Sequence, residues 1–267
     1  MYCELINRAS RAHPFLSRLA DVKHIPHFHP ETEIVYVIDG EVTFTLDIHS
    51  HTVVAGDICV ISPDVIHTLF TEHNSTTFVM KLYPAVDLTN IRFDEPVITP
   101  QTHGYQQLKA CILQIMQEDR TRGLGYQLAV NVHAEKIFLL LLREFRHHTL
   151  EGNNISRHIS ESTFLSRIND YLDTYYTEDF GLDDIVTRLG YEKSYFCRHF
   201  KQVTSMTFWE YYTLFRLERS VQLMKQSPKD TISVVATASG FKNIRSYNIA
   251  FKKAYRCTPM EYKRKLL

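Results

Sequence analysis

The chain has 267 residues, of which 44% are hydrophobic, enough to fill the core of one large domain or two medium-sized domains. Its 30 basic and 30 acidic residues cancel, so the whole-chain charge indicates neither a nucleic acid nor a membrane as partner. The five cysteines are scattered without a CxxC pair, which argues against a disulfide framework or a zinc knuckle and favours a reducing compartment.

No segment of the sequence predicts membrane insertion or export. The longest unbroken aliphatic and aromatic run, Ile137–Leu142, is far too short to span a bilayer. Near the N-terminus, Glu4 and the lack of a long apolar core argue against a secretion signal. We therefore expect a cytoplasmic protein that does not contact a membrane.

The charges are unevenly distributed along the chain. Residues 1–150 contain 12 basic and 17 acidic residues, a net charge of −5, whereas residues 188–267 contain 16 basic and 5 acidic residues, a net charge of +11. A basic C-terminal part behind an acidic N-terminal part is typical of a DNA-binding module fused to another domain. A solvated basic surface would give the same count, so this interpretation depends on the motifs described below.

Residues 1–100 show short β-rich runs separated by turn residues. The runs Glu33–Ile38 and Val42–Ile48 flank Asp39 and Gly40, a strong hairpin signal. Further runs follow at Thr52–Val54, Asp57–Ile61 and Thr76–Leu82. Many short strands at this spacing predict an antiparallel barrel or jelly roll.

Polar residues in this region are spaced like the ligands of a site. His27 and His29 alternate, so on a strand they would share one face, and Glu33 and His67 follow them. The spacing HxHxxxE, followed after six residues by Gly40, resembles the first motif of the cupin barrel. In metal-binding cupins the residues that match these three imidazoles and one carboxylate are the ligands, a donor set that suits Zn, Mn, Fe or Ni.

Three interpretations of this cluster remain open. It is a divalent metal site, or a metal-free pocket for a small organic effector to which Tyr36 also contributes, or neither. The mouth of a barrel needs polar groups to orient a ligand whether or not a metal is present. No cofactor is therefore certain, and a divalent metal in the barrel is the candidate.

Residues 101–148 change to a helical period. A first helix, residues 105–119, has apolar residues on one face, and a second, residues 126–146, includes the stretch Ile137–Leu142 that is apolar all round. This is more apolar surface than one contact with a barrel needs, and it favours a homodimer interface over a simple cap on the barrel. The polar residues 149–161 are expected to be a linker, and Phe164–Tyr176 the first helix after it.

The C-terminal region contains two copies of one sequence pattern, with an offset of 50 or 51 residues. Each copy has an apolar triplet for a short helix, a glycine that can end it, and a second helix with aromatic residues four apart. These residues are Leu182, Ile185, Val186, Gly190, Tyr191, Phe196 and Phe200 in the first copy, and Ile232, Val235, Ala236, Gly240, Phe241, Tyr247 and Phe251 in the second. The pattern predicts two helix-turn-helix units, residues 182–203 and 232–254.

The second helix of each unit has polar faces that fit the major groove of DNA. In the first unit the candidate DNA-binding residues are Lys193, Ser194, Tyr195, Arg198, Lys201 and Gln202. In the second unit they are Asn243, Ile244, Arg245, Ser246, Asn248, Lys252 and Lys253.

This doubled motif, with Arg216–Arg219 between its copies and Thr258–Lys263 after them, resembles the AraC/XylS family of bacterial transcription regulators. The resemblance implies two helix-turn-helix units joined by a long helix, about Thr207–Lys225, whose recognition helices enter successive major grooves on one face of bent DNA. It also implies that Arg198 reads a base.

The sequence departs from the family pattern at three positions. Ile249 stands where the second unit usually has its base-reading arginine, so Arg245 and Asn248 are the expected substitutes. Ser205 and Arg256 stand where glycine usually follows a recognition helix. A left-handed backbone at either of these two residues would cost about 1 kcal/mol.

Together these features predict an α+β protein with four parts: a cupin-like effector-binding barrel (1–100), a helical dimerisation segment (101–148), a linker (149–161) and an all-α DNA-binding domain (162–267). We expect a transcription regulator rather than an enzyme, in which the barrel senses a small molecule and controls promoter binding or activation. Its expected partners are double-stranded promoter DNA, the effector, RNA polymerase and a second copy of the chain. The alternative is a metal-dependent cupin enzyme or a metal-sensing regulator that uses the histidine cluster.

Overall fold

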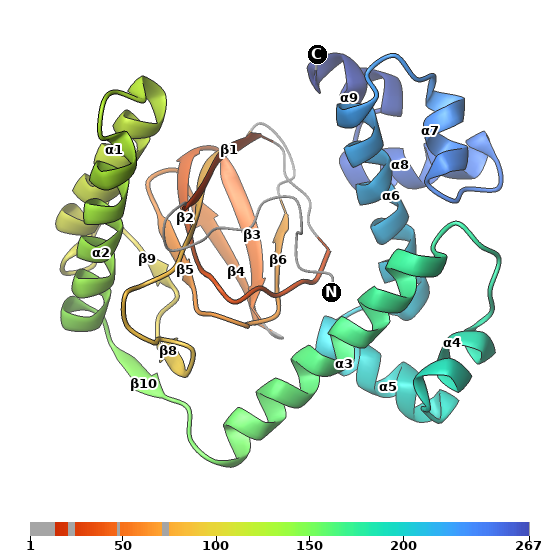
Figure 1. Ribbon diagram of the computed structural model, residues 1–267, viewed down its shortest axis with the longest axis horizontal. Helices are drawn as coiled ribbons and strands as arrows, with labels where there is room; N and C mark the ends of the chain where they lie inside the picture. Colours follow the sequence, from red (N-terminus) through yellow and green to blue (C-terminus); the bar gives the residue numbers. More distant parts are fainter. Residues whose placement is uncertain (1–13, 21–24, 47–48, 71–74, 267) are drawn as a thin grey trace. The chain divides into compact units, whose positions relative to one another are not determined.

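The computed structural model describes residues 14–20, 25–46, 49–70 and 75–266 (Figure 1). The chain forms two compact bodies. Of the described residues, the N-terminal body contains 14–20 and 28–162, and the C-terminal body contains 25–27 and 163–266. No helix in the described part of the chain combines the length and the apolar character that crossing a membrane requires.

The N-terminal body is built on antiparallel sheets. One sheet has the strand order β1 (Phe15–Ala20), β7 (Thr76–Leu82), β2 (Thr32–Asp39), β5 (Ile58–Ile61) and β9 (Val97–Ile98). A second has the order β4 (His49–Val54), β3 (Glu41–Leu46) and β6 (His67–Phe70), and the short strands β8 (Ile91–Phe93) and β10 (His147–Thr149) pair separately. Among the described residues no strand pairing joins the first two sheets, so closure into a barrel stays a prediction.

The predicted hairpin at Asp39 and Gly40 is a turn between two sheets rather than a hairpin within one. Gly40 has the left-handed backbone that such a turn requires, with φ of 79°. However, β2 pairs with β5 and β7, whereas β3 pairs with β4 and β6. Both edges of β2 are thus occupied, which explains why the local turn signal did not produce a β2–β3 ladder.

Each face of the five-stranded sheet is covered by a different layer, because successive side chains of a strand point to opposite faces. On one face Ile34 and Tyr36 of β2 belong to the core shared with helices α1 (Tyr105–Thr121) and α2 (Tyr126–Glu144). On the other face Val35 and Val37 pack in a core that includes Val42, Phe44, Val53 and Leu69 of the three-stranded sheet. The N-terminal body therefore has a helix layer and two sheet layers.

The segment predicted to be a polar linker is mostly helical. Helix α3 runs from Asn153 to Tyr175, so it contains most of residues 149–161 as well as the predicted helix Phe164–Tyr176. His147 and His148, which precede it, lie in strand β10. Residues 153–163 contain no glycine or proline, so nothing in this segment interrupts the helix.

The C-terminal body contains the two predicted helix-turn-helix units. The first is α4 (Leu182–Leu189) with α5 (Lys193–Thr204), and the second is α7 (Ile232–Ala238) with α8 (Ile244–Tyr255). Between them runs α6 (Phe208–Gln226), and α9 (Pro259–Leu266) follows the second unit (Figure 1). Aromatic rings of Phe164, Phe196, Phe200 and Phe208 pack around the first unit. The core of the second includes residues from α6, α7 and α8, namely Leu217, Val221, Met224, Val235, Tyr247 and Phe251.

The turns of the two units have the predicted backbone. Gly190 and Gly240, which follow α4 and α7, both have left-handed conformations, with φ of 75° and 87°. Ser205 and Arg256, which follow α5 and α8, are also left-handed, with φ of 59° and 57°. Each recognition helix thus ends in a conformation that costs a non-glycine residue about 1 kcal/mol.

Candidate functional site

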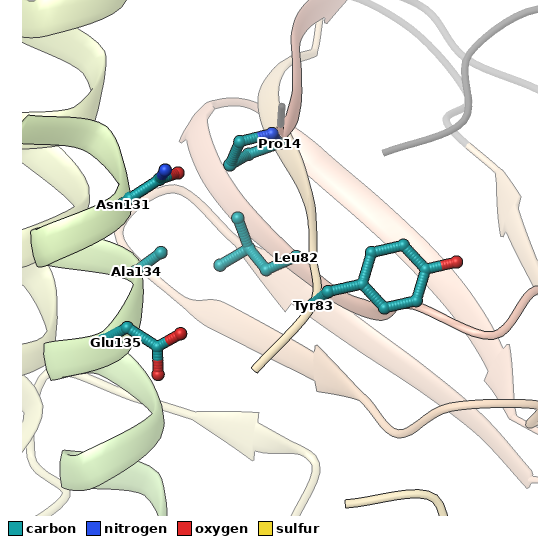
Figure 2. Close-up of a pocket in the computed structure, with 6 residues that line it drawn as sticks. All are labelled: Pro14, Leu82, Tyr83, Asn131, Ala134 and Glu135. Carbon is teal, nitrogen blue, oxygen red and sulfur yellow. The ribbon is translucent and has the colours of Figure 1, made fainter. Parts of the chain in front are cut away.

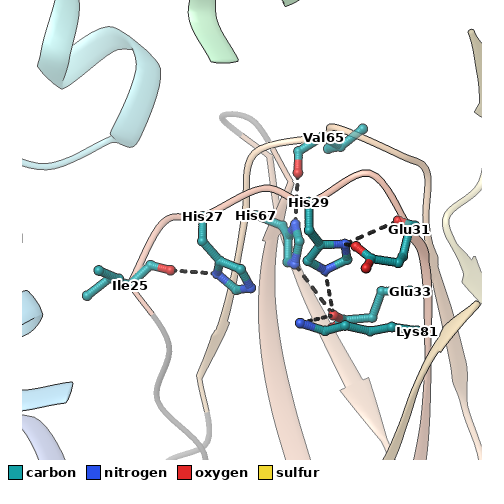
Figure 3. A network of polar contacts seen from close by, with 8 residues as sticks. All are labelled: Ile25, His27, His29, Glu31, Glu33, Val65, His67 and Lys81. Carbon is teal, nitrogen blue, oxygen red and sulfur yellow. Dashed lines mark hydrogen bonds and ion pairs between the residues drawn. The ribbon is translucent and has the colours of Figure 1, made fainter. Parts of the chain in front are cut away.

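The structure brings the four predicted histidine and glutamate residues of the N-terminal region together. One ligand atom from each of His27, His29, Glu33 and His67 lies within 4.8 Å of the others, and all four side chains are buried (Figure 3). Glu33 lies on β2 and His67 begins β6, whereas His27 and His29 lie before β2 rather than on a strand. The expected reason for their convergence, alternation along one strand, is therefore wrong, although the convergence itself is present.

Glu33 is at the centre of the polar contacts. Its Oε2 atom lies 2.8 Å from Nε2 of His29, 3.8 Å from Nε2 of His67 and 3.7 Å from Nζ of Lys81 (Figure 3). Lys81 is the residue directly opposite Glu33 in the β2–β7 ladder, and its exposed fraction is only 4%. A buried carboxylate is thus surrounded by basic groups from three strands or loops.

All three imidazoles are oriented by the same kind of bond. Nδ1 of His27 and of His67 each lies 2.8 Å from the backbone carbonyl oxygen two residues before it, and Nδ1 of His29 lies 3.2 Å from the carbonyl oxygen two residues after it. Because a carbonyl oxygen only accepts, each Nδ1 donates, which fixes the ring orientation and gives Nε2 the metal-facing role.

The electrostatics of the cluster differ from residue to residue. Burial alone would raise the pKa of Glu33, but the hydrogen bond from His29 and the positive charge of Lys81 hold this pKa well below its ordinary value. Burial would lower the pKa of His29, but bonds to two carboxylates outweigh it and raise the pKa to about 9. Burial lowers the pKa of His67. The shifts of Glu33 and His29 thus favour a charged pair of these two residues.

These residues fit a divalent transition metal by donor type and by spacing. Nitrogen and carboxylate ligands lie about 2.0–2.2 Å from zinc, so two of them are about 4 Å apart at most. A set of donor atoms within 4.8 Å of one another needs only a small contraction to reach that geometry. The ammonium group of Lys81 competes with a metal ion for Glu33, because it already places a positive charge 3.7 Å from the carboxylate.

Two further residues of the cluster, Lys81 and Glu31, were not predicted from the sequence. Glu31 is buried, and one of its carboxylate oxygens lies 3.3 Å from Nδ1 of His29. Lys81 could have been singled out because it is the single charged residue in the otherwise apolar or hydroxyl-bearing run Thr76–Leu82. Tyr36, in contrast, was predicted to join the cluster but lies in the core on the opposite face of β2, beside the helices.

A separate cavity beside α2 is too small for an organic effector. It measures about 20 Å³ and lies between the end of β7 and the middle of the helix, lined by Pro14, Leu82, Tyr83, Asn131, Ala134 and Glu135 (Figure 2). This volume accommodates about one water molecule. We therefore assign no effector role to it.

The predicted DNA-binding residues lie on the two recognition helices, with their polar faces exposed. On α5, Ser194, Tyr195, Arg198, Lys201 and Gln202 are exposed whereas Phe196 and Phe200 are buried. On α8, Ile244, Arg245, Ser246, Asn248, Lys252 and Lys253 are exposed whereas Tyr247 and Phe251 are buried. Each helix thus packs by one face and presents the opposite face to solvent.

Two of the predicted DNA-binding residues also have a structural role. The Asn243 side chain accepts a hydrogen bond from the backbone N–H of Ser246 (2.8 Å) and so caps α8. Lys193 forms an exposed ion pair with Asp183 of α4 (2.8 Å). On α5 the corresponding cap is Glu192, which accepts from the backbone N–H groups of Ser194 and Tyr195, and these bonds lower its pKa.

Comparisons with known proteins match both bodies. Residues 185–265 match the family model described as a helix-turn-helix domain, and residues 15–138 match the model described as an AraC-like ligand binding domain. The chain belongs to the AraC family of transcription regulators. The cluster described above thus lies within the ligand-binding region of an AraC-type protein, and both recognition helices lie within its helix-turn-helix region.

Individual members of the AraC family resemble this chain at low identity. The HTH-type transcriptional activator RhaS from Pectobacterium atrosepticum is 24% identical over 87% of this chain and 85% of its own length. The Msm operon regulatory protein from Streptococcus mutans is 24% identical over 49% of this chain, which spans about half of that relative (45%). A crystal structure of an apo ToxT variant from Vibrio cholerae aligns with 97% of this chain and all of its own, with a TM-score of 0.57 and 12% identity, which supports the fold.

Proposed function

We propose that this chain is a sequence-specific, DNA-binding transcription regulator whose N-terminal body senses a small molecule and thereby controls promoter binding or activation. The observation that carries the proposal is the pair of helix-turn-helix units with exposed, basic recognition faces, in a segment with a net charge of +11. Because the relatives are transcription regulators, an enzymatic reaction is not part of the proposal. The site of action is the cytoplasm, where promoter DNA and RNA polymerase, the further expected partner, are found.

Arg198 is the residue on α5 that we propose reads a base. It is exposed, and its helical neighbours one turn away, Ser194, Lys201 and Gln202, are exposed and able to form hydrogen bonds. An arginine in the major groove can donate two hydrogen bonds to guanine. The lysines of α5 and α8 contribute contacts to phosphates, which add affinity without reading sequence.

The test of DNA reading compares two variants on selected and random duplexes. Arg198→Ala is expected to weaken binding to the selected site by about 1–3 kcal/mol and to leave the melting temperature unchanged, because the side chain is exposed. Lys229→Ala removes one exposed charge from the turn between α6 and α7 and serves as the control. An equal loss on selected and random DNA would show that Arg198 contacts phosphate only. Failure of the full-length chain to select any sequence would contradict the proposed function.

We further propose that the effector binds at the histidine cluster, and that metal sensing is the specific form of this function to test first. The support is the shared bond from Nδ1 of each imidazole to a carbonyl, the usual arrangement behind metal-ligating histidines. When bound, a divalent ion would be held by His29, Glu33 and His67, with His27 as a fourth ligand, and would supply charge and fixed geometry to the sensor.

Metal analysis of protein purified without an affinity tag separates the metal from an organic effector. Stoichiometric zinc, manganese, iron or nickel, lost in His29→Ala and His67→Ala, supports metal sensing. Absence of metal, together with DNA binding unchanged by chelators, would reject it. A thermal-shift screen with sugars and other small organic molecules then tests the organic effector.

We also propose that the chain forms a homodimer through the helical pair, for which the sequence predicted residues 105–119 and 126–146. The support is an apolar stripe on α2, formed by Leu128, Val132 and Leu139, whose exposed fractions are 70%, 57% and 44%. These three residues recur at spacings of four and seven, so they lie on one face of the helix. A second copy would cover this stripe with an identical one.

A further inference from the structure

The second recognition helix presents an isoleucine where the first presents an arginine. Ile249 has an exposed fraction of 62%, the largest of the exposed large hydrophobic side chains in the described part of the C-terminal body. It occupies the position in α8 that Arg198 occupies in α5. A large apolar side chain held in water at the middle of a basic helix has no role in the core of this body.

The residues one helical turn from Ile249 surround it with polar and basic groups. Side chains three and four positions apart are neighbours on a helix surface. Arg245 and Ser246 precede Ile249 by these spacings, Lys252 and Lys253 follow it, and all four are exposed. Tyr247, Phe251 and Ala254, which face the core, are on the opposite side of the helix. Ile249 is therefore the centre of the outward face.

This arrangement matches DNA better than it matches a protein. Three cations around one apolar group are complementary to a major groove, where phosphates line the edges and base edges form the floor. The apolar group that base pairs present in the major groove is the 5-methyl group of thymine. Another copy of this chain would instead bring three further cations against the same three.

We infer that Ile249 is a specificity-determining residue that packs against the thymine 5-methyl group of one base pair in the major groove, an inference that rests on the proposed DNA-binding function. The two units then read DNA by different chemistry. Arg198 selects a base pair by hydrogen bonds, whereas Ile249 selects one by an apolar contact that cytosine and guanine do not offer.

The test removes single methyl groups from the DNA. Full-length protein first selects its binding sequence from a random duplex library. Each thymine of the selected site is then replaced in turn by 2′-deoxyuridine, which keeps every hydrogen-bonding group and lacks only the methyl group. Dissociation constants are measured by fluorescence anisotropy for the wild type, for Ile249→Ala and for the control Val234→Ala, which trims an exposed apolar residue of α7 in the same unit.

At one thymine we expect uracil to weaken wild-type and Val234→Ala binding by about three- to tenfold, the range for one buried methyl-sized contact. The same replacement should leave the affinity of Ile249→Ala unchanged, since the methyl group then has no partner. Because Ile249 is exposed, the melting temperature of the variant should match that of the wild type.

Two results would overturn the inference without affecting the proposed function. One is a selected site at which no uracil replacement weakens the wild type. The other is an equal loss for the wild type and Ile249→Ala at every thymine. If the full-length protein selects no sequence, the proposed function and the inference both fail. Reselection with Ile249→Arg is an independent check, and it should replace the thymine preference by guanine at that position.

Discussion

Lys81 and Glu33 lie opposite each other in the β2–β7 ladder, and both are nearly inaccessible to solvent. Removing one partner of a buried ion pair leaves the other charge without compensation, which usually costs about 3–5 kcal/mol. Here His29 remains hydrogen bonded to Glu33, so part of the compensation stays in place. The lysine is therefore important for the metal-free cluster but replaceable by another cation.

From this geometry we predict opposite effects of Lys81→Met on stability and on metal binding. In the presence of a chelator, the unfolding free energy of the variant should be about 2 kcal/mol lower than that of the wild type, because Glu33 has lost one of its charge partners. Its affinity for zinc should rise at least about tenfold, since the ammonium no longer repels the ion. Urea unfolding and a competitive zinc titration measure the two quantities. Lys136→Met, an exposed lysine of α2, is the control, and an unchanged zinc affinity in Lys81→Met would contradict the prediction.

The close spacing of His27, His29 and Glu33, together with the resemblance to the cupin motifs that also includes His67, predicted this cluster from the sequence. The sequence marks Lys81 as an unusual charge in an apolar strand but could not place it beside Glu33. Pairing of β2 with β7 brings together residues 48 positions apart, and a single sequence does not give the register of that pairing. It also assigned Tyr36 to the cluster, although Tyr36 and Glu33 are separated by an odd number of residues along β2 and face opposite sides.

The two repeat glycines give a matched test of backbone conformation. A Cβ atom on Gly190 would meet nothing within 4 Å, so Gly190→Ala should cost only the left-handed strain, about 1 kcal/mol. On Gly240 it would lie 2.5 Å from the Tyr176 carbonyl oxygen and 2.8 Å from Nε of Arg216, which are themselves hydrogen bonded to each other. Gly240→Ala should therefore cost about 2–4 kcal/mol. Equal losses for the two variants in urea unfolding would show that the close approach at Gly240 is not rigid.

At the scale of elements, the boundaries of the recognition helices followed from the repeat, whereas the start of α3 did not. The repeat fixes each helix by an apolar spacing, a glycine and a capping residue, all of which are readable in the sequence. The N-terminal part of α3 has few apolar residues, so its period gave no signal, and the polar composition was interpreted as a linker. A segment without glycine or proline can continue a helix whose other half is anchored by packing, as Leu165, Ile168 and Leu172 are here.

The start of α6 contains a capping box that makes a specific prediction for this element. The hydroxyl of Thr207 accepts from the backbone N–H of Glu210 (3.3 Å), and the Glu210 carboxylate accepts from the backbone N–H of Thr207 (2.9 Å). Thr207→Ala should destabilise the C-terminal body by about 1 kcal/mol. Thr213→Ala, within the same helix, should have almost no effect, because alanine has the higher helix propensity. Urea unfolding of the full-length variants measures both, and a Thr213 effect as large as that of Thr207 would show that the cap is not the cause.

At the scale of the whole molecule, the uneven distribution of charged residues along the chain predicted two modules with different functions. The first 150 residues have a net charge of −5 and the last 80 a net charge of +11. An acidic sensor is not attracted to DNA, so the attraction to phosphate is expected to come from the basic C-terminal segment. A dimer would raise that affinity by tethering two such modules, because binding of the second becomes intramolecular.

The apolar stripe of α2 provides the last prediction. In a two-fold symmetric dimer each residue near the axis meets its own copy, so one substitution places two like charges against each other. Leu128→Lys combined with Val132→Lys should therefore convert the protein from dimer to monomer in sedimentation at micromolar concentration. The far-UV circular dichroism spectrum should be unchanged, since both side chains are largely exposed within a single chain. Val54→Lys, which charges an exposed residue at the end of β4, should remain dimeric.

Measurements of DNA binding distinguish loss of the dimer interface from loss of folding. On a duplex with two copies of the selected site the monomeric variant should bind about 100-fold more weakly than the wild type, because the second contact is no longer tethered. On a duplex with one copy the two proteins should bind equally, since the recognition helices are untouched. A wild-type chain that sediments as a monomer, with and without effector, would contradict the proposed dimer interface. A double variant that remains a dimer would show that the dimer interface does not include this face of α2.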